Sequence, residues 1–253
     1  MTEQTTVPGS ATREAGSGPL GLGVVPLLLV SPVEAFRRLA REPRWIGPFV
    51  LGVLLVTIGM WLALTVTLEA SAQKAEQIMG KLGVPEAKRT EALANLPSPD
   101  DRSAAVLIRN VAVPGLIVVA FGFLMAGVLH LFVRLSGRTP AFRQTLTLFS
   151  AGFVVVALGD LVKSALMAAS GTMEVTLGPG ALIPDLRYDS VPSILLDFLD
   201  VFSVWNLVLL TIGGAVLWGT TRRASFGICG TFWLLKGLLV VAGRLFGAWL
   251  GAT

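Results

Sequence analysis

The sequence contains very few of the residues on which most metal sites and many enzymes depend. It has one cysteine, Cys229, and one histidine, His130, among 253 residues. A single cysteine excludes an internal disulfide and a cysteine-based zinc site, and a single histidine excludes most histidine-based metal sites and catalytic groupings. The sequence therefore indicates no catalytic residues, no metal site and no cofactor.

Charge is also scarce. Charged residues make up 14% of the chain, whereas an ordinary soluble domain carries about 25%. Hydrophobic residues make up 53%, and the mean hydropathy is +0.74. This composition excludes a soluble enzyme, a disordered chain and a disulfide scaffold. The net charge of +4 is better explained by basic loops that face anionic lipid or the cytoplasm than by nucleic acid, so we expect no nucleic-acid partner.

Five apolar segments are long enough to cross a bilayer. A helix needs about 20 apolar residues to cross a hydrocarbon core of about 30 Å, and backbone groups in lipid must be satisfied within the segment. Charged residues interrupt only the third and fifth segments. We therefore predict an all-α integral membrane protein, a five-transmembrane-helix bundle. Its spans are expected at about residues 46–68, 110–133, 144–169, 201–221 and 224–250.

The residues before the first span divide into a tail and a short helix. Residues 1–30 are predicted to be a polar, disordered N-terminal tail, because their only apolar run is short and is broken by Pro26. Residues 31–43 predict an amphipathic helix, with Ser31 and Glu34 as a capping box and Phe36 on its apolar face. We expect this helix to lie in the membrane interface, and the alternative is a solvated connector.

Basic residues gather in alternate loops. They precede the first span, fill the loop between the second and third, and follow the fourth: Arg37, Arg38, Arg41, Arg44, Arg134, Arg138, Arg143, Arg222 and Arg223. Residues 69–109, which we predict to form an exoplasmic helical loop, hold equal numbers of acidic and basic residues, and residues 170–200 are mainly acidic. Because basic loops stay inside, the N-terminus is predicted to be cytoplasmic and the C-terminus exoplasmic.

Ionisable residues inside or beside the spans form the main candidate site. A spacing of three places Asp160 and Lys163 on one helix face, and a charge within a span is a functional hypothesis by default. The helical rise brings six residues to a polar layer in the outer half of the bundle: Asp160, Lys163, Asp197, Asp200, Lys236 and Arg244. Structural ion pairing between helices is the favoured interpretation, because no nucleophile or metal grouping accompanies them. The alternative is a cavity for a polar or anionic ligand.

A row of small residues lies near the C-terminus. Gly243, Gly247 and Gly251 recur every four residues, and such faces let helix backbones approach closely. Packing within the chain is the favoured interpretation, and a homo-oligomer is the alternative.

Three segments resemble the Yip domain family, the Ypt/Rab-interacting-protein-like multipass membrane proteins, in its bacterial form. They are residues 31–39 (SPVEAFRRL), residues 138–146 (RTPAFRQTL) and residues 199–213 (LDVFSVWNLVLLTIG) followed by Arg222, Arg223 and Ala224. The resemblance covers roughly residues 30–250, so a Yip-like membrane domain is expected over 31–253. None of these motifs is catalytic.

The resemblance implies five transmembrane helices, a cytoplasmic N-terminus and, for a bacterial member, the cytoplasmic membrane. Eukaryotic relatives act in vesicle trafficking, partly through a cytoplasmic N-terminal region that is longer than the segment before the first predicted span of this chain. The trafficking role is therefore not carried over to this chain. The expected function is a non-enzymatic scaffold or accessory factor for other membrane components, with the lipid bilayer and a membrane protein as partners. The alternative is a small transporter or accessory permease subunit with a polar intramembrane path.

Overall fold

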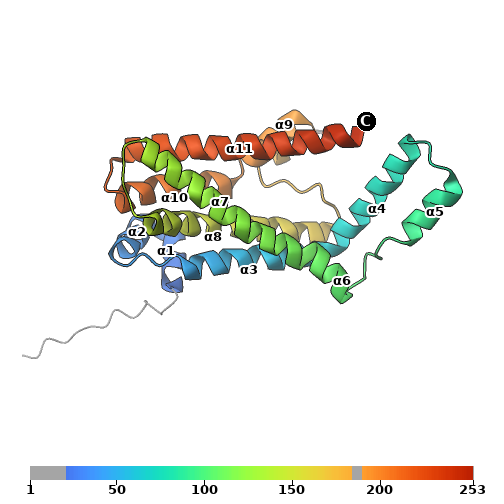
Figure 1. Cartoon of the computed structure of the whole chain (residues 1–253), viewed down its shortest axis with the longest axis horizontal. Helices are drawn as coiled ribbons and strands as arrows, with labels where there is room; N and C mark the ends of the chain where they lie inside the picture. Colours follow the sequence, from blue (N-terminus) through green and yellow to red (C-terminus); the bar gives the residue numbers. More distant parts are fainter. Residues whose placement is uncertain (1–20, 184–189, 253) are drawn as a thin grey trace, which may run out of the picture.

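Helices account for nearly all of the regular structure, and most of them run along one common direction (Figure 1). The computed structural model describes residues 21–183 and 190–252. In chain order the elements are η1 (Leu22–Val24), α1 (Val25–Val30), α2 (Pro32–Arg41), α3 (Ile46–Leu62), α4 (Leu64–Lys81), α5 (Glu86–Ala94), α6 (Ala104–Leu107), η2 (Ile108–Ala112), α7 (Val113–Leu135), α8 (Phe142–Ser170), η3 (Pro179–Leu182), α9 (Val191–Phe198), α10 (Val201–Leu217) and α11 (Arg222–Ala252).

Three helical stretches are long and apolar enough to cross a membrane by themselves: Ala104–Leu135, Phe142–Ser170 and Arg222–Gly243. Two further pairs, α3 with α4 and α9 with α10, qualify only when each pair is taken as one broken span. The described residues therefore contain three to five candidate spans, which confirms the all-helical membrane fold class.

The first predicted span, 46–68, is not straight. The helix α3 ends at Leu62, and α4 continues from Leu64 to Lys81 at an angle of 58°. Leu64 and Leu68 are buried against Val106 at the start of the next span. This tertiary contact stabilises the bend. A hydropathy pattern does not predict the bend, because the contact joins residues that are far apart in the sequence. The helices α4 and α5 then project from the bundle (Figure 1).

The second span begins earlier than predicted. Its helix starts at Ala104, whereas the expected start was residue 110. Between Ile108 and Ala112 the backbone widens into a π-helical turn, which lies just before Pro114. A proline lacks the backbone N–H of the regular helical ladder, and local π turns accommodate such interruptions. The helical loop expected over 69–109 therefore consists of α4 from residue 69 onward and of α5, with α6 belonging to the next span.

The N-terminal predictions need two corrections. Residues 1–20 lie outside the described residues, but the remainder of the predicted tail forms η1 and α1, with Leu28 fully buried. The predicted amphipathic helix exists as α2, and its apolar face packs on α10, where Phe36 is also fully buried; its position in the membrane interface stays a prediction. The capping box is absent: Ser31 makes no side-chain capping bond, and Glu34 pairs with Arg38 at 3.1 Å.

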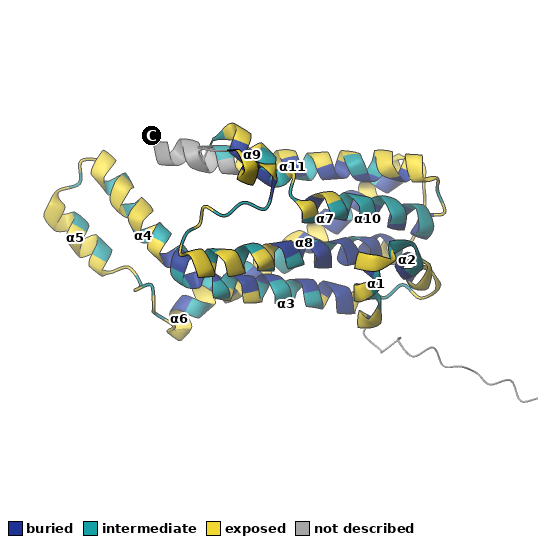
Figure 2. Cartoon of the chain, turned by 180° about the vertical axis from the view of Figure 1, so that it is seen from behind, coloured by how far each residue is buried: buried dark blue, intermediate teal, exposed yellow. Residues whose placement is uncertain are grey.

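The helix α8 lies between α3 and α10, and part of it is dark blue, which marks buried residues, in Figure 2. In its most apolar stretch 61% of residues are buried, against 28% for the span that contains α7 and 22% for α11. The helix α3 packs along one side of α8 and α10 along another. Glycines permit these close approaches, since a Cβ at Gly52 would overlap the ring of Phe153 and one at Gly159 would overlap Phe202.

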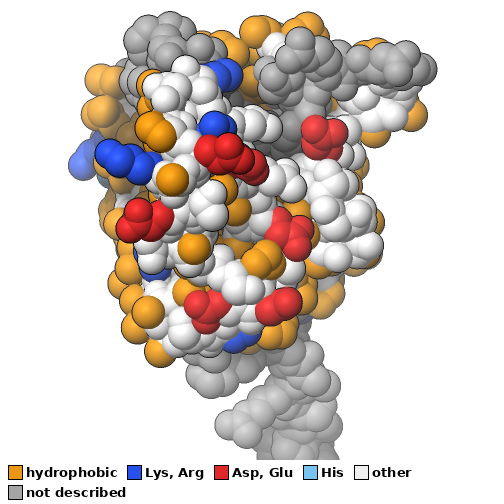
Figure 3. Space-filling model, turned by 90° about the vertical axis from the view of Figure 1, so that its right-hand side faces the viewer, with side chains coloured by type: hydrophobic (Ala, Val, Ile, Leu, Met, Phe, Trp, Pro, Cys, Tyr) orange, Lys and Arg blue, Asp and Glu red, His pale blue; other side chains and the backbone are white. Residues whose placement is uncertain are grey.

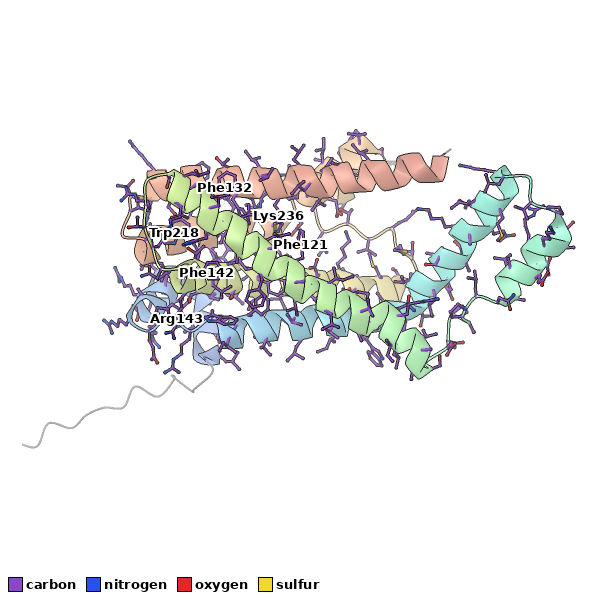
Figure 4. The ribbon with its side chains drawn as sticks, viewed as in Figure 1. Phe121, Phe132, Phe142, Arg143, Trp218 and Lys236 are labelled. Atoms are coloured by element: carbon purple, nitrogen blue, oxygen red, sulfur yellow. The ribbon has the colours of Figure 1, made fainter. Side chains whose placement is uncertain are left out.

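Three basic segments that are distant in sequence meet at one end of the bundle. These are α2, the α7–α8 connection and the start of α11 (Figures 1 and 4). Arg143, labelled in Figure 4, ties two of them together, because its Nε donates a hydrogen bond of 2.8 Å to the backbone oxygen of Pro43. Acidic side chains are spread over the opposite end (Figure 3).

The contact at Gly213 yields a stability prediction. A Cβ there would press on the buried side chains of Leu148 and Phe36. Gly213→Ala should therefore lower the free energy of unfolding by about 1–3 kcal/mol, the usual cost of overpacking. Gly227→Ala is the matched control in a helix, because no atom lies within 4 Å of the added Cβ and alanine favours helix. Thermal unfolding in detergent measures both variants. Equal melting temperatures for Gly213→Ala and Gly227→Ala would contradict the close packing at Gly213.

Candidate functional site

Five of the six predicted charged residues gather around one polar cavity. Asp160 and Lys163 come from α8, Asp197 from α9, Asp200 from the α9–α10 break and Lys236 from α11. The cavity has a volume of about 160 Å³. Figure 4 labels Lys236 midway along the bundle.

The strongest interaction at the cavity joins α8 to α9. Lys163 Nζ donates to both carboxylate oxygens of Asp197, at 3.0 and 2.8 Å. The Thr176 hydroxyl donates a further bond of 3.0 Å to Asp197 Oδ1. The Asp197 side chain is only 7% exposed. A buried carboxylate is tolerated when it is paired and hydrogen-bonded in this way. Lys163 therefore pairs with a residue 34 positions away, and Asp160 is not its ion-pair partner.

Asp200 has a local structural role. It is the N-cap of α10, where its Oδ1 accepts hydrogen bonds from the backbone nitrogens of Phe202 and Ser203, at 2.7 and 2.9 Å. Such a cap satisfies N–H groups that have no partner within the helix, and it favours a negative charge at the helix N-terminus. This cap separates α10 from α9, and the two helices meet at an angle of 46°.

Asp160 and Lys236 lie between two cavities, unlike Lys163 and Asp197, which line only the polar one. Asp160 and Lys236 both line the polar cavity and also a second cavity of about 260 Å³. Within the described part of the chain neither one makes a direct ion pair. The second cavity is mainly apolar, with Asn206 as its other polar lining residue. Asn206 is 6% exposed, and its Oδ1 has no hydrogen-bond partner among the described residues.

The remaining predicted site residues lie near the C-terminus of α11. Arg244, Gly247 and Gly251 belong to α11, but the structure describes only their helical backbone. A Cβ at Gly243 would meet no atom within 4 Å. Within the described residues, no contact at Gly243 supports packing within the chain, and the interpretation of this glycine row stays a prediction.

Two residues of the site were missed by sequence reasoning. Thr176 lies in an irregular loop, where nothing in the sequence marks it as a partner of Asp197. Asn206 carried a usable signal, because it is an amide inside an otherwise apolar span and such groups need hydrogen-bond partners.

Comparison with known proteins decides the family. The Yip1 domain matches residues 27–243. The chain belongs to the Yip1 domain family. The matched range contains every described residue around the polar cavity, and Arg244 follows directly after it. The expected resemblance to Yip domain proteins is confirmed.

A curated relative adds the bacterial context of this Yip1 domain chain. "Membrane protein YknW" of Bacillus subtilis (strain 168) is 23% identical over 219 residues, which cover 84% of this chain and 89% of that protein. Its name describes a membrane protein and assigns no activity. No solved structure matches the chain.

The ion pair in this Yip1 domain yields a second prediction. Lys163→Met removes the side chain that donates to both carboxylate oxygens of the buried Asp197, which should lower the free energy of unfolding by about 1–3 kcal/mol. The double variant Lys163→Met/Asp197→Leu removes both charges and should recover at least half of that loss. A double-mutant cycle of thermal unfolding in lipid nanodiscs would measure the coupling. Additive effects of the two substitutions would show that the pair contributes no coupling energy.

Proposed function

We propose that this Yip1 domain protein is a non-enzymatic scaffold or accessory factor for other components of the bacterial cytoplasmic membrane. In this proposal each bent helix pair is one span, so that five helices cross the bilayer. The N-terminus is cytoplasmic and the C-terminus is exoplasmic. The observation that carries the proposal is the basic end of the bundle, assembled from three segments that are distant in sequence.

The charge distribution supports this orientation. The arginines of the α2 region, of the α7–α8 connection and of the α10–α11 connection lie at the same end. Acidic side chains are spread over the other end (Figure 3). Arginine and lysine near the ends of spans are retained on the cytoplasmic side.

The basic end is suited to contact with anionic lipid headgroups or an acidic protein surface. Arg138, Arg222 and Arg223 are exposed there. Exposed arginines near a membrane surface attract anionic groups by about 1 kcal/mol each. Beside them, α7 and α11 expose broad apolar faces along the bundle, including Leu116 at 69% and Leu238 at 65%. These faces are available to lipid or to the helices of another membrane protein.

Labelling of engineered cysteines tests the orientation. The unmodified chain is a suitable background, because Cys229 is its only cysteine and is buried. Gly137→Cys between α7 and α8 should react with a membrane-impermeant maleimide only after cells are opened. Ser98→Cys between α5 and α6 should react in intact cells. Reversal of this pattern would show that the proposed orientation is wrong.

Crosslinking and affinity purification from native membranes test the scaffold function. Arg222→Gln/Arg223→Gln should lower the amount of captured partner several-fold, because it removes two charges from the basic end. Lys74→Gln/Lys88→Gln removes two exposed charges from α4 and α5 and is the matched control. Asp160→Asn and Lys236→Met should retain the partner. No captured partner, together with altered solute uptake in stable Asp160→Asn or Lys236→Met variants, would contradict the scaffold proposal and favour transport.

A further inference from the structure

The polar and apolar cavities adjoin each other. Val156, Asp160 and Lys236 line both of them. Their volumes of about 160 and 260 Å³ together reach the range of about 300–1,000 Å³ in which small-molecule sites lie. A ligand that occupies both cavities must therefore be apolar at one end and polar at the other.

The apolar part is built by five helices. Its lining includes Val56 from α3, Val118 from α7, Phe153 from α8, Leu210 from α10 and Phe232 from α11. An empty apolar cavity is unfavourable, because the atoms that line it lose their dispersion contacts. Water cannot replace those contacts, since it needs polar partners.

The apolar part also has access to the bilayer. Two of its lining residues, Ile117 and Phe121, are 61% and 49% exposed on the outer side of α7. Figure 4 labels Phe121 on that helix. A hydrocarbon chain from the surrounding bilayer can thus reach the cavity between the helices without passing through water.

The polar groups at the junction specify the other end of the ligand. The Lys236 ammonium is a donor and attracts an anion, whereas the Asp160 carboxylate accepts hydrogen bonds. The Asn206 side chain is 94% buried, since it is 6% exposed, and its Oδ1 lacks a hydrogen-bond partner. That oxygen lies against Gly152 of α8 and has no surface open to the cavity, so Asp160 is the group at the junction that can accept a hydrogen bond from a ligand.

We propose that the two cavities bind one glycerophospholipid, with an acyl chain in the apolar part and the headgroup at the junction. The phosphate contacts Lys236, and an N–H or O–H donor of the headgroup contacts Asp160. Phosphatidylethanolamine and phosphatidylglycerol both carry a phosphate and such donors. Phosphatidylcholine carries a phosphate and no N–H or O–H group. The proposal requires only the membrane fold and does not depend on the scaffold function.

Native mass spectrometry tests which headgroup the site prefers. Lipid is added to the full chain in detergent, and the lipid that stays bound after the detergent is removed is identified. We expect one retained molecule of phosphatidylethanolamine or phosphatidylglycerol per chain. It should bind at least about tenfold more tightly than phosphatidylcholine with the same acyl chains, as one added hydrogen bond provides. A preference for the first lipid assigns the donor to an ammonium, and a preference for the second assigns it to hydroxyl groups. Equal binding of all three, or of none, would overturn the proposal.

Variants locate the lipid within the bundle. Lys236→Met should weaken binding of the preferred lipid about tenfold, whereas Lys74→Met on α4 should not. Asp160→Asn should reduce the preference over phosphatidylcholine, because a neutral amide accepts a hydrogen bond more weakly than a carboxylate. Val118→Trp fills the apolar cavity and should weaken every lipid, and Leu116→Trp on the exposed side of the same helix is its matched control.

Unchanged lipid retention by folded Val118→Trp and Lys236→Met would place the lipid elsewhere and overturn the proposal. Thermal unfolding in detergent identifies the variants that remain folded. If Val118→Trp does not fold, the headgroup comparison remains decisive, because it uses the unmodified chain.

Discussion

Close approach of helices to α8 is the constraint on which the rest of this bundle depends. Helices in lipid gain little from the hydrophobic effect on association, so they rely on shape, dispersion and a few polar contacts. Here small residues provide the shape: Gly52 and Gly159 accept aromatic rings, and Gly152 accepts the side chain of Asn206. The same approach brings α10 and α11 near the charged groups of α8, so the packing of the apolar core also builds the polar cavity.

The charges around that cavity have separate physical roles. Lys163 and Asp197 neutralise each other and hold α9 against α8. Asp200 caps α10. Asp160 and Lys236 instead face the space between the helices, where they join a polar cavity to an apolar one. For a scaffold function, the Lys163–Asp197 ion pair and the Asp200 cap are sufficient, because they stabilise the bundle. The lipid proposed for the junction would also make the occupied bundle more stable than the empty one, because a ligand stabilises the state that it binds.

Much of the fold and part of the site were predictable because they rest on local chemistry. The lengths of the apolar segments predicted helices in the right regions, and the spacing of the arginines assigned them to one end of the molecule. The packing of α2 on α10 was not predictable, because Phe36 and Leu39 are equally suited to lipid and to a neighbouring helix. The capping box was wrong for a similar reason, since Glu34 can reach both a helix N-terminus and Arg38.

The amino-acid order alone specified an apolar, helical chain with charges at a common depth, because hydropathy and helical periodicity act over short distances. The three-dimensional packing chose the partner of Lys163, the bend at Ala63 and the junction of the two cavities. Those choices depend on groups far apart along the chain, such as Lys163 with Asp197 and Leu64 with Val106. Periodicity within one helix cannot specify them, because it does not say which helix will lie beside it.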